Sequence, residues 1–183
     1  MKGELRITGH RPYPLPDSPW IMEQLWNDVL FLHWPVPVEK MAKHIPAQLK
    51  LDTFNGTAWI GIMPFGIRKM RIRGFPPFPF MKTMNELNVR TYVAYEERKG
   101  VYFFSLDANN ALAVMGARKL YFLPYKNADI IIEHKQKQVI YKTRRKSGNS
   151  EREEFYGVYQ PISNPCNSKP GSLDEWLTER YCL

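Results

Sequence analysis

Four polar side chains of different chemistry alternate along residues 85 to 93. If this segment is a β-strand, Glu86, Asn88, Arg90 and Tyr92 lie on one face, because successive side chains of a strand point to opposite sides of the sheet. An acid, an amide, a guanidinium and a phenol in one row can recognise a polar ligand, and an arginine can hold a carboxylate or phosphate through two parallel hydrogen bonds. The alternative is an outer sheet face wetted by solvent.

The neighbouring segment indicates where this row lies. Residues 101 to 107 are mostly apolar and typical of a strand, so we expect the two strands to be central and the row to be buried. Buried charges must be paired or meet a ligand, so Arg90 either binds a ligand or forms an ion pair with Glu86 or Asp107. We predict the hairpin turn at residues 98 to 100. A two-residue turn places Asp107 in the row, whereas a three-residue turn moves it to the other face.

The composition suits a sheet-rich protein with one hydrophobic core. The 183 residues contain 44% hydrophobic and 14% aromatic side chains, with 15 prolines and 11 glycines in turn-like positions, and nothing marks a second domain. We therefore predict a single domain over residues 1–183, of the α+β class and mainly β.

Local signals predict further elements. An Asn-Gly pair at residues 55–56 tolerates the positive φ angles of a type I′ turn and places a hairpin at residues 49–63. Residues 108–119 have the pattern of an interior helix, and Ser172 with Glu175 forms a capping box for a terminal helix. A short helix is expected at residues 39–45, and strands at residues 26–36, 65–73, 130–134, 138–142 and 154–160.

No membrane span or metal site is predicted. The start of the chain has no apolar signal segment, and no apolar run approaches the roughly 20 residues that a spanning helix needs, so we predict a cytoplasmic protein without a membrane partner. Cys166 and Cys182 form no CxxC pair, which fits a reducing compartment. The four histidines are dispersed, so we expect no metal and no cofactor. His33, beside Trp34 and Pro35, is interpreted as a structural histidine.

The basic charge raises a second class of function. A formal charge of +8 and a pI near 9.5 are compatible with a nucleic-acid-binding or regulatory protein. Much of the excess lies in residues 134 to 146, around a predicted hairpin. Lysines on an edge strand also prevent strand-to-strand aggregation, so a solvated edge is the competing interpretation. Salt dependence distinguishes the two, because phosphate binding weakens steeply as salt is added.

Several motifs together are more specific than periodicity. They are His-Trp-Pro-Val at 33–36, Leu-Asp-Thr-Phe-Asn-Gly-Thr-Ala-Trp-Ile at 51–60, Glu-Leu-Asn-Val-Arg-Thr-Tyr-Val at 86–93, Val-Tyr-Phe-Phe-Ser-Leu-Asp-Ala at 101–108, Ala-Arg-Lys-Leu at 117–120 and Leu-Pro-Tyr at 123–125. In these motifs the chain resembles the YqjF-like family of uncharacterised bacterial proteins, from about residue 20 to residue 181. That family is grouped with the acetoacetate decarboxylase-like superfamily. The resemblance implies a closed, cone-shaped antiparallel β-barrel with an internal ligand cavity and a few peripheral helices.

The resemblance also bears on length and on catalysis. Relatives continue past the segment similar to residues 177–181 into further strands, so a barrel without its C-terminal strands is one alternative for this chain. Acetoacetate decarboxylases act through a lysine whose pKa is lowered by a neighbouring cation. When the similar stretches are aligned on Arg118, Pro124 and Ala128, Tyr125 stands at the lysine position and Lys126 beside it. A phenol cannot form an imine, and using Lys126 instead requires a one-residue shift that reverses its side-chain direction.

We therefore expect a small-molecule-binding protein, either a binder or an enzyme acting on a carbonyl or carboxylate compound. The ligand is expected to be a small, anionic molecule, and a homo-oligomer remains open. The loop at residues 74–80, rich in proline and phenylalanine, either covers one end of the fold or lines an entrance. Glu86 is also similar to the acidic residue of the decarboxylases. The candidate ligand-binding residues are Glu86, Asn88, Arg90, Tyr92, Asp107, Arg118 and Tyr125.

The position of Tyr125 predicts that the protein forms no Schiff base. After incubation with acetoacetate and borohydride, the intact mass should be unchanged, because a phenol offers no amine to the carbonyl. A stable adduct mapped to Lys126 by peptide mass spectrometry would contradict this prediction and place the lysine in the catalytic register.

Overall fold

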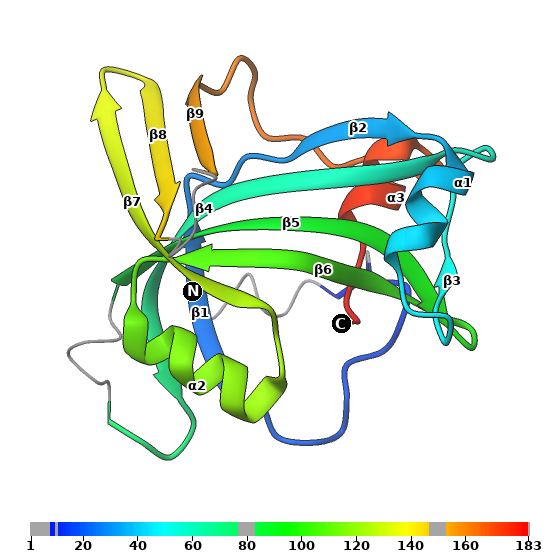
Figure 1. The fold of residues 1–183 in the computed structure, drawn as a ribbon, viewed down its shortest axis with the longest axis horizontal. Coiled ribbons are helices and arrows are strands. Elements are labelled where there is room, and N and C mark those ends of the chain that lie inside the picture. The colour runs from blue at the N-terminus through cyan, green and yellow to red at the C-terminus, as the bar shows by residue number, and fades with distance from the viewer. Residues whose placement is uncertain (1–7, 10, 77–82, 147–152, 183) are drawn as a thin grey trace.

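The computed structural model describes residues 8–9, 11–76, 83–146 and 153–182, so residues 77–82 of the proline-rich loop lie outside the described part. Its strands are β1 (Met22–Asn27), β2 (Leu32–Val36), β3 (Lys50–Leu51), β4 (Ala58–Ile72), β5 (Thr83–Tyr95), β6 (Arg98–Ala108), β7 (Tyr125–Lys135), β8 (Gln138–Arg145) and β9 (Glu154–Tyr159). They form one sheet in the order β1-β4-β5-β6-β7-β8-β9, with β2 also paired to β4 and β3 to β5 (Figure 1).

The helices are few, as the composition predicts. They are α1 (Val38–Met41), followed by the 3-10 turn η2 (Ala42–His44), then α2 (Ala111–Tyr121) and α3 (Leu173–Thr178). The predicted capping residue of the terminal helix is confirmed, because the Ser172 side chain accepts a hydrogen bond from the backbone N–H of Glu175. The described chain is therefore mainly β, with most helices short.

The closed antiparallel barrel is not confirmed. Among the described residues no ladder joins β1 to β9, the two ends of the strand order. The ladder between β6 and β7 is parallel, since α2 carries the chain back before β7 begins. The predicted hairpin around residues 55–56 has its positive φ angles, but β3 pairs with β5 rather than with β4.

The β5–β6 hairpin differs from its prediction. Its turn lies at residues 96–97, because Tyr95 pairs with Arg98. The register then shifts between Val89 and Arg90, which pair with Ser105 and Phe103 and leave Phe104 as an extra residue. This bulge changes the face of every later side chain of β6. Asp107 lies opposite Leu87 rather than beside Glu86, so of the two places considered for it the structure has the one on the other face, outside the polar row.

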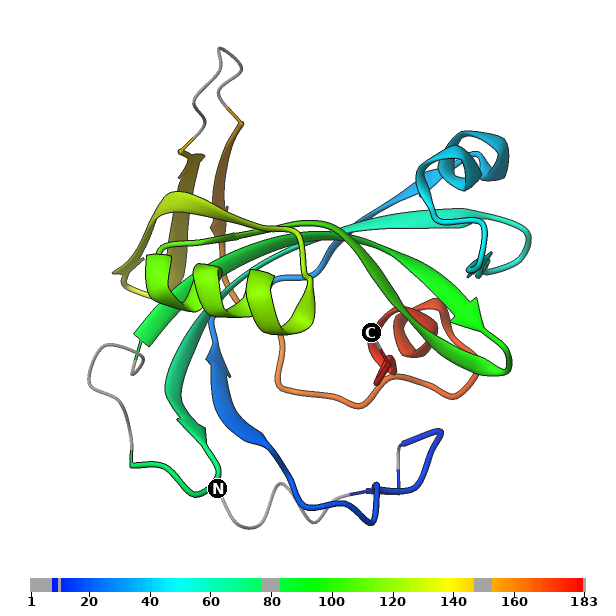
Figure 2. The same ribbon diagram turned by 60° about the horizontal axis from the view of Figure 1, so that its bottom comes forward.

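The central strands β4, β5 and β6 carry a core on each side. The row face, on which Glu86 and Arg90 point, also holds the buried cluster of Met63, Phe65, Ile67, Met70, Met84, Ala108 and Val114. The opposite face holds the cluster of Leu87, Ala128, Ile130 and Tyr141. Figure 2 shows α3 on one side of these strands and α1 on the other. Because both faces are covered, polar side chains of β5 must find partners inside the protein.

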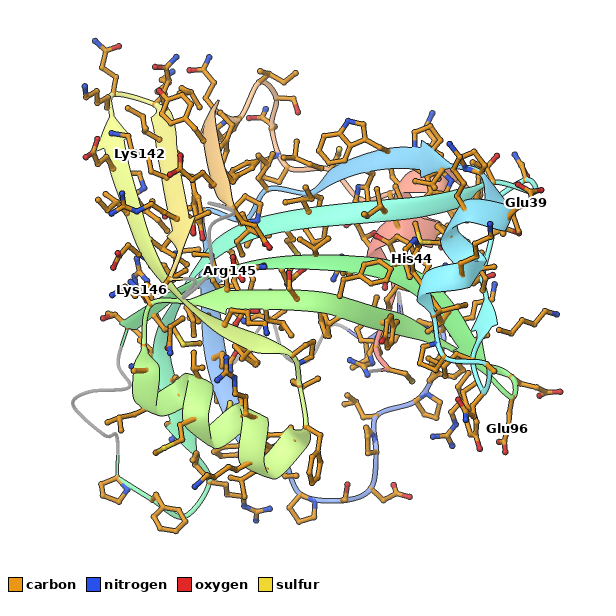
Figure 3. All side chains as sticks on the ribbon, in the orientation of Figure 1. Glu39, His44, Glu96, Lys142, Arg145 and Lys146 are labelled. Atoms are coloured by element: carbon orange, nitrogen blue, oxygen red, sulfur yellow. The ribbon has the colours of Figure 1, made fainter. Side chains whose placement is uncertain are left out.

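On the opposite face, one ion pair joins β6 to β8. Arg145 donates from Nε to the Asp107 carboxylate at 2.9 Å and from Nη2 to the Ser105 hydroxyl at 3.0 Å, and it also contacts Glu153. The Asp107 side chain is 5% exposed and that of Arg145 is 14% exposed. Burial raises the pKa of Asp107 although the arginine opposes this shift. Figure 3 shows Arg145 near the point where β8 meets the central strands.

This pairing predicts a large effect of removing the arginine. Arg145→Met should lower the free energy of unfolding by about 3–5 kcal/mol, because it leaves the buried Asp107 carboxylate without its cation. Lys142→Met is the matched control on the same strand. It removes an exposed lysine whose Nζ lies 3.7 Å from Glu133, and it should cost less than about 1 kcal/mol. Urea unfolding at neutral pH measures both, and equal losses would contradict a structural role for the pair.

Candidate functional site

The polar row, defined as Glu86, Asn88, Arg90 and Tyr92, is buried at the centre of the sheet. The four residues are 3%, 2%, 8% and 0% exposed, in that order. Strand β5, which carries them, lies between β4 and β6. The solvent-wetted alternative is therefore wrong, and the remaining question is how each polar group is satisfied.

Glu86 forms the protonation centre of the row. The Tyr125 hydroxyl donates to Glu86 Oε2 at 2.8 Å, and Asn88 also hydrogen-bonds the carboxylate. Burial raises the pKa of Glu86 to about 7, although the hydrogen bonds from Tyr125 and Asn88 oppose this shift. Burial, together with the adjacent acid, raises the pKa of Tyr125. Near neutral pH the Glu86 carboxyl can therefore hold or release a proton while the phenol keeps its own.

Arg90 lacks the ion pair that a buried guanidinium usually has. Among the described residues no carboxylate lies within ion-pairing distance of it, so neither Glu86 nor Asp107 serves as its partner. The guanidinium carbon lies 5.4 Å from the ring centre of Phe31 and 5.8 Å from that of Tyr92. The buried Nε has no hydrogen-bond partner in the structure. The nearest aromatic groups stabilise the charge only in part.

His33, which the sequence indicates to be a structural histidine, reaches the Tyr92 end of the row. Its Nε2 lies 2.6 Å from the Tyr92 hydroxyl. Burial lowers the pKa of His33 to about 4, the nearby charge of Arg90 contributes to this shift, and Asp174 opposes it, so the imidazole is neutral at pH 7. The contact depends on Gly61, because a Cβ there would lie 3.2 Å from the imidazole. Only the pairing of β2 with β4 places His33 here, and no local sequence signal shows it.

Tyr125 lies at the row, whereas Arg118 and Lys126 do not. Arg118 is exposed, and its Nε donates to the backbone oxygen of Tyr125 at 2.6 Å, so it holds the start of β7. Lys126 is exposed and stands opposite Asp107 in the ladder, on the face away from Tyr125. The structure thus brings together five of the seven predicted residues, leaving out Asp107 and Arg118.

Four of the seven basic side chains of the segment at residues 134–146 lie against acids. Lys146 lies 2.7 Å from Asp129, and His134 lies 3.0 Å from Asp28. Arg145 and Lys142 are paired as described above. These contacts reduce the cationic charge that this surface presents to phosphate groups.

The described part of the chain has neither a metal-ligating cluster nor a helix that could span a membrane. It contains no group of three or more His, Cys, Asp or Glu side chains that could hold a metal ion. None of the helices described there is both long and apolar enough to cross a membrane.

Comparison with known proteins identifies similar sequences. The family model DUF2071, described as an uncharacterized conserved protein, matches residues 23–183. The uncharacterized protein YqjF of Bacillus subtilis (strain 168) is 48% identical over 169 residues, which are 92% of this chain and 69% of that protein. The resemblance inferred from the motifs is therefore confirmed.

Solved structures show a similar fold. An acetoacetate decarboxylase-like enzyme from Sphingomonas wittichii RW1 matches with a TM-score of 0.52 and 13% identity, over 74% of this chain and 59% of that one. The enduracididine biosynthesis enzyme MppR, complexed with pyruvate, matches with a TM-score of 0.53 and 12% identity, over 74% of this chain and 55% of that one. The chain thus spans less than two thirds of the length of these structures. At such identities the likeness shows the fold alone.

The environment of Glu86 predicts a pH dependence of stability. Its pKa is about 7 in the folded protein against an ordinary value of 4.5, so the folded state binds the proton more tightly. The stability contributed by this proton is fully present below pH 4.5 and is lost as the pH rises through 7. Relative to Glu86→Gln, the free energy of unfolding of the parent should fall by about 3 kcal/mol between pH 4 and pH 8. Urea unfolding across this range measures it, and Glu154→Gln, which removes an exposed carboxyl, is the control.

Proposed function

The chain belongs to the DUF2071 family of uncharacterized conserved proteins, and we propose that it binds a small carboxylate compound through the polar row, with Arg90 as the anion-binding group. The observation that carries this proposal is a buried guanidinium without a carboxylate partner in the described chain. Leaving a buried charge uncompensated is costly, so proteins pair such groups or use them for ligands. A ligand carboxylate would supply the missing anion and accept a hydrogen bond from Nε.

A second unsatisfied atom narrows the ligand class. Asn88 Oδ1 is buried and has no hydrogen-bond partner. Asn88 and Arg90 are two residues apart on one strand face, which separates their Cα atoms by roughly 6.5 Å. A compound with a carboxylate at one end and a hydroxyl, or another donor, two or three atoms away can bridge them. Hydroxy acids and the enol forms of keto acids have this arrangement.

Glu86 gives the site a group for proton transfer. Its carboxyl hydrogen-bonds Asn88, so it lies at the end of the row away from Tyr92. With a pKa of about 7 it can donate a proton to, or accept one from, a ligand oxygen or the carbon next to a carbonyl. An enzyme acting on a keto or hydroxy acid would use Glu86 as its acid or base. Tyr125 would orient that carboxyl rather than act as a nucleophile.

Phe31 marks a route to the row. Its ring centre lies 5.4 Å from the Arg90 guanidinium carbon and the residue is 40% exposed, so in this proposal the ligand reaches Arg90 past this side chain. At the Tyr92 end of the row, Trp176 of α3 packs on Tyr92 with ring centres 4.7 Å apart. Under this proposal, the polar row lies on the wall of the ligand cavity that the acetoacetate decarboxylase-like fold implies.

Arg90→Met tests the proposal, because it keeps much of the side-chain volume and removes all five donors. The variant should fold with little loss of stability, since no carboxylate is left unpaired. Pyruvate and lactate should raise the melting temperature of the parent by about 3–5 °C at ten times their Kd, and should leave the variant unchanged. Arg144→Met, which removes an exposed cation on β8, is the matched control and should respond like the parent.

Two results would contradict this proposal. The first is a variant that loses about 3–5 kcal/mol of stability, as expected if Arg90 belongs to a buried ion pair. The second is a parent protein whose melting temperature no small carboxylate changes.

A further inference from the structure

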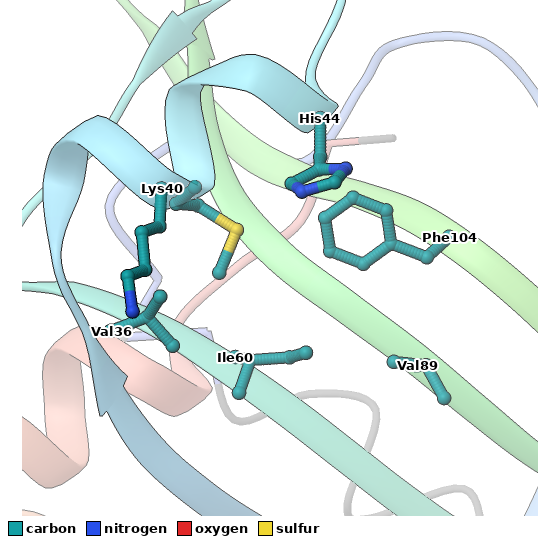
Figure 4. Close-up of a pocket in the computed structure, with 7 residues that line it drawn as sticks. Val36, Lys40, His44, Ile60, Val89 and Phe104 are labelled. Atoms are coloured by element: carbon teal, nitrogen blue, oxygen red, sulfur yellow. The ribbon is translucent and has the colours of Figure 1, made fainter.

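A separate pocket of about 360 Å³ lies on the opposite face of the same sheet. Its size falls within the roughly 300–1,000 Å³ typical of small-molecule sites. Its floor consists of side chains from four strands, and α1 with η2 forms one wall (Figure 4). The floor residues are Val36, Ile60, Val89 and Phe104.

Strand alternation and the bulge make this floor apolar. Val89 adjoins Arg90 in β5, so its side chain points away from the polar row. Ile60, in the neighbouring strand, also points to this face. Phe104 is the extra residue of the β6 bulge, and the bulge lets its ring line the pocket. Met41, 4% exposed, closes the side formed by the short helix.

The titratable residues that line this pocket, Lys40 and His44, are both exposed to solvent. Lys40 lies beside Val36 and His44 beside Phe104 (Figure 4). Within the described part of the chain neither side chain forms an ion pair. None of the lining residues is acidic. The pocket therefore combines an apolar interior with an unpaired ammonium at its mouth, the complement of a molecule with an apolar chain and an anionic head.

We propose that this pocket binds the hydrocarbon chain of a medium-chain carboxylate, whose head group pairs with Lys40. The apolar floor and Met41 remove the chain from water, and the ammonium favours a carboxylate over a neutral or cationic head of the same length. This site is independent of the one at Arg90, because the two lie on opposite faces of β5. Failure of the Arg90 proposal would leave it standing, and the reverse also holds.

Decanoate, decanol and decyltrimethylammonium are the probes, since they share a chain and differ in head-group charge. Calorimetry should give a Kd for decanoate of about 10 μM to 1 mM, with decanol about fivefold weaker and the cation weaker still. Lys40→Gln should weaken decanoate about fivefold and leave decanol unchanged. Lys43→Gln is the matched control, because it removes an exposed lysine of the same turn that does not line the pocket. Arg90→Met should bind decanoate like the parent.

The position of the chain is read without any substitution. In protein labelled at the methionine methyl groups, decanoate should shift the NMR signal of Met41, which lines the pocket. The signal of Met63, buried on the row face, should stay in place. The proposal is wrong if decanoate does not bind at 1 mM, a concentration at the weak end of the affinity expected for about a dozen heavy atoms. It is also wrong if Lys40→Gln and Lys43→Gln behave alike, or if Met63 shifts instead of Met41.

Discussion

The arrangement of β7 and β8 depends on the hydrogen bonds that Glu86 accepts inside the sheet. Its carboxyl accepts a hydrogen bond from Tyr125 at the start of β7, and its backbone oxygen accepts one from Tyr141 of β8 at 2.7 Å. One residue of β5 therefore anchors β7 and β8, the first two strands after α2. Loss of either phenol removes a hydrogen bond from a buried oxygen of Glu86, and such a loss is costly in a low-dielectric interior.

Two buried charged groups of the central strands, Asp107 and Arg90, differ in whether the protein itself supplies a partner of opposite charge. Asp107 is enclosed by Arg145 and Ser105, so the protein itself satisfies that carboxylate. Arg90 is also buried, but among the described residues it contacts the rings of Phe31 and Tyr92 and hydrogen-bonds Tyr92 instead of meeting a carboxylate. A buried pair that is complete contributes to the fold, whereas a buried cation without an anion is a place where a ligand gains most. Val89, next to Arg90 in β5, points to the opposite face and lines the apolar pocket, so one strand contributes to both candidate sites.

The family and the fold constrain the chemistry less than the residues do. The acetoacetate decarboxylase-like fold is shared with structures at 12–13% identity, a level that carries no catalytic residue with it. At the position where the resemblance implies a lysine, the chain has Tyr125, whose hydroxyl is committed to Glu86. The amine of Lys126 faces away, since its register partner is Asp107. The polar row thus has an acid with a pKa of about 7 beside the Tyr125 phenol, at the position where the resemblance implies an amine.

The sequence by itself determined the features that depend on local geometry. Alternation along residues 85–93 placed the polar row on one face of a strand, and the capping residue Ser172 and the Asn-Gly pair at 55–56 located a helix and a turn. Each of these follows from backbone sterics or from hydrogen bonds within a few residues.

Only the tertiary structure decided which side chains meet across the sheet. A single extra residue, Phe104, moved Asp107 to the other face, and no local signal in β6 marks that bulge. Likewise, His33 contacts Tyr92, 59 positions away in the sequence. The one-turn helix α1 places Lys40 beside Val36 of the sheet (Figure 4). Side-chain direction along a strand repeats every two residues, so a register error of one residue places every later side chain on the wrong face. The sequence therefore identified the polar row, whereas its partners, its unpaired arginine and the pocket behind it came from packing.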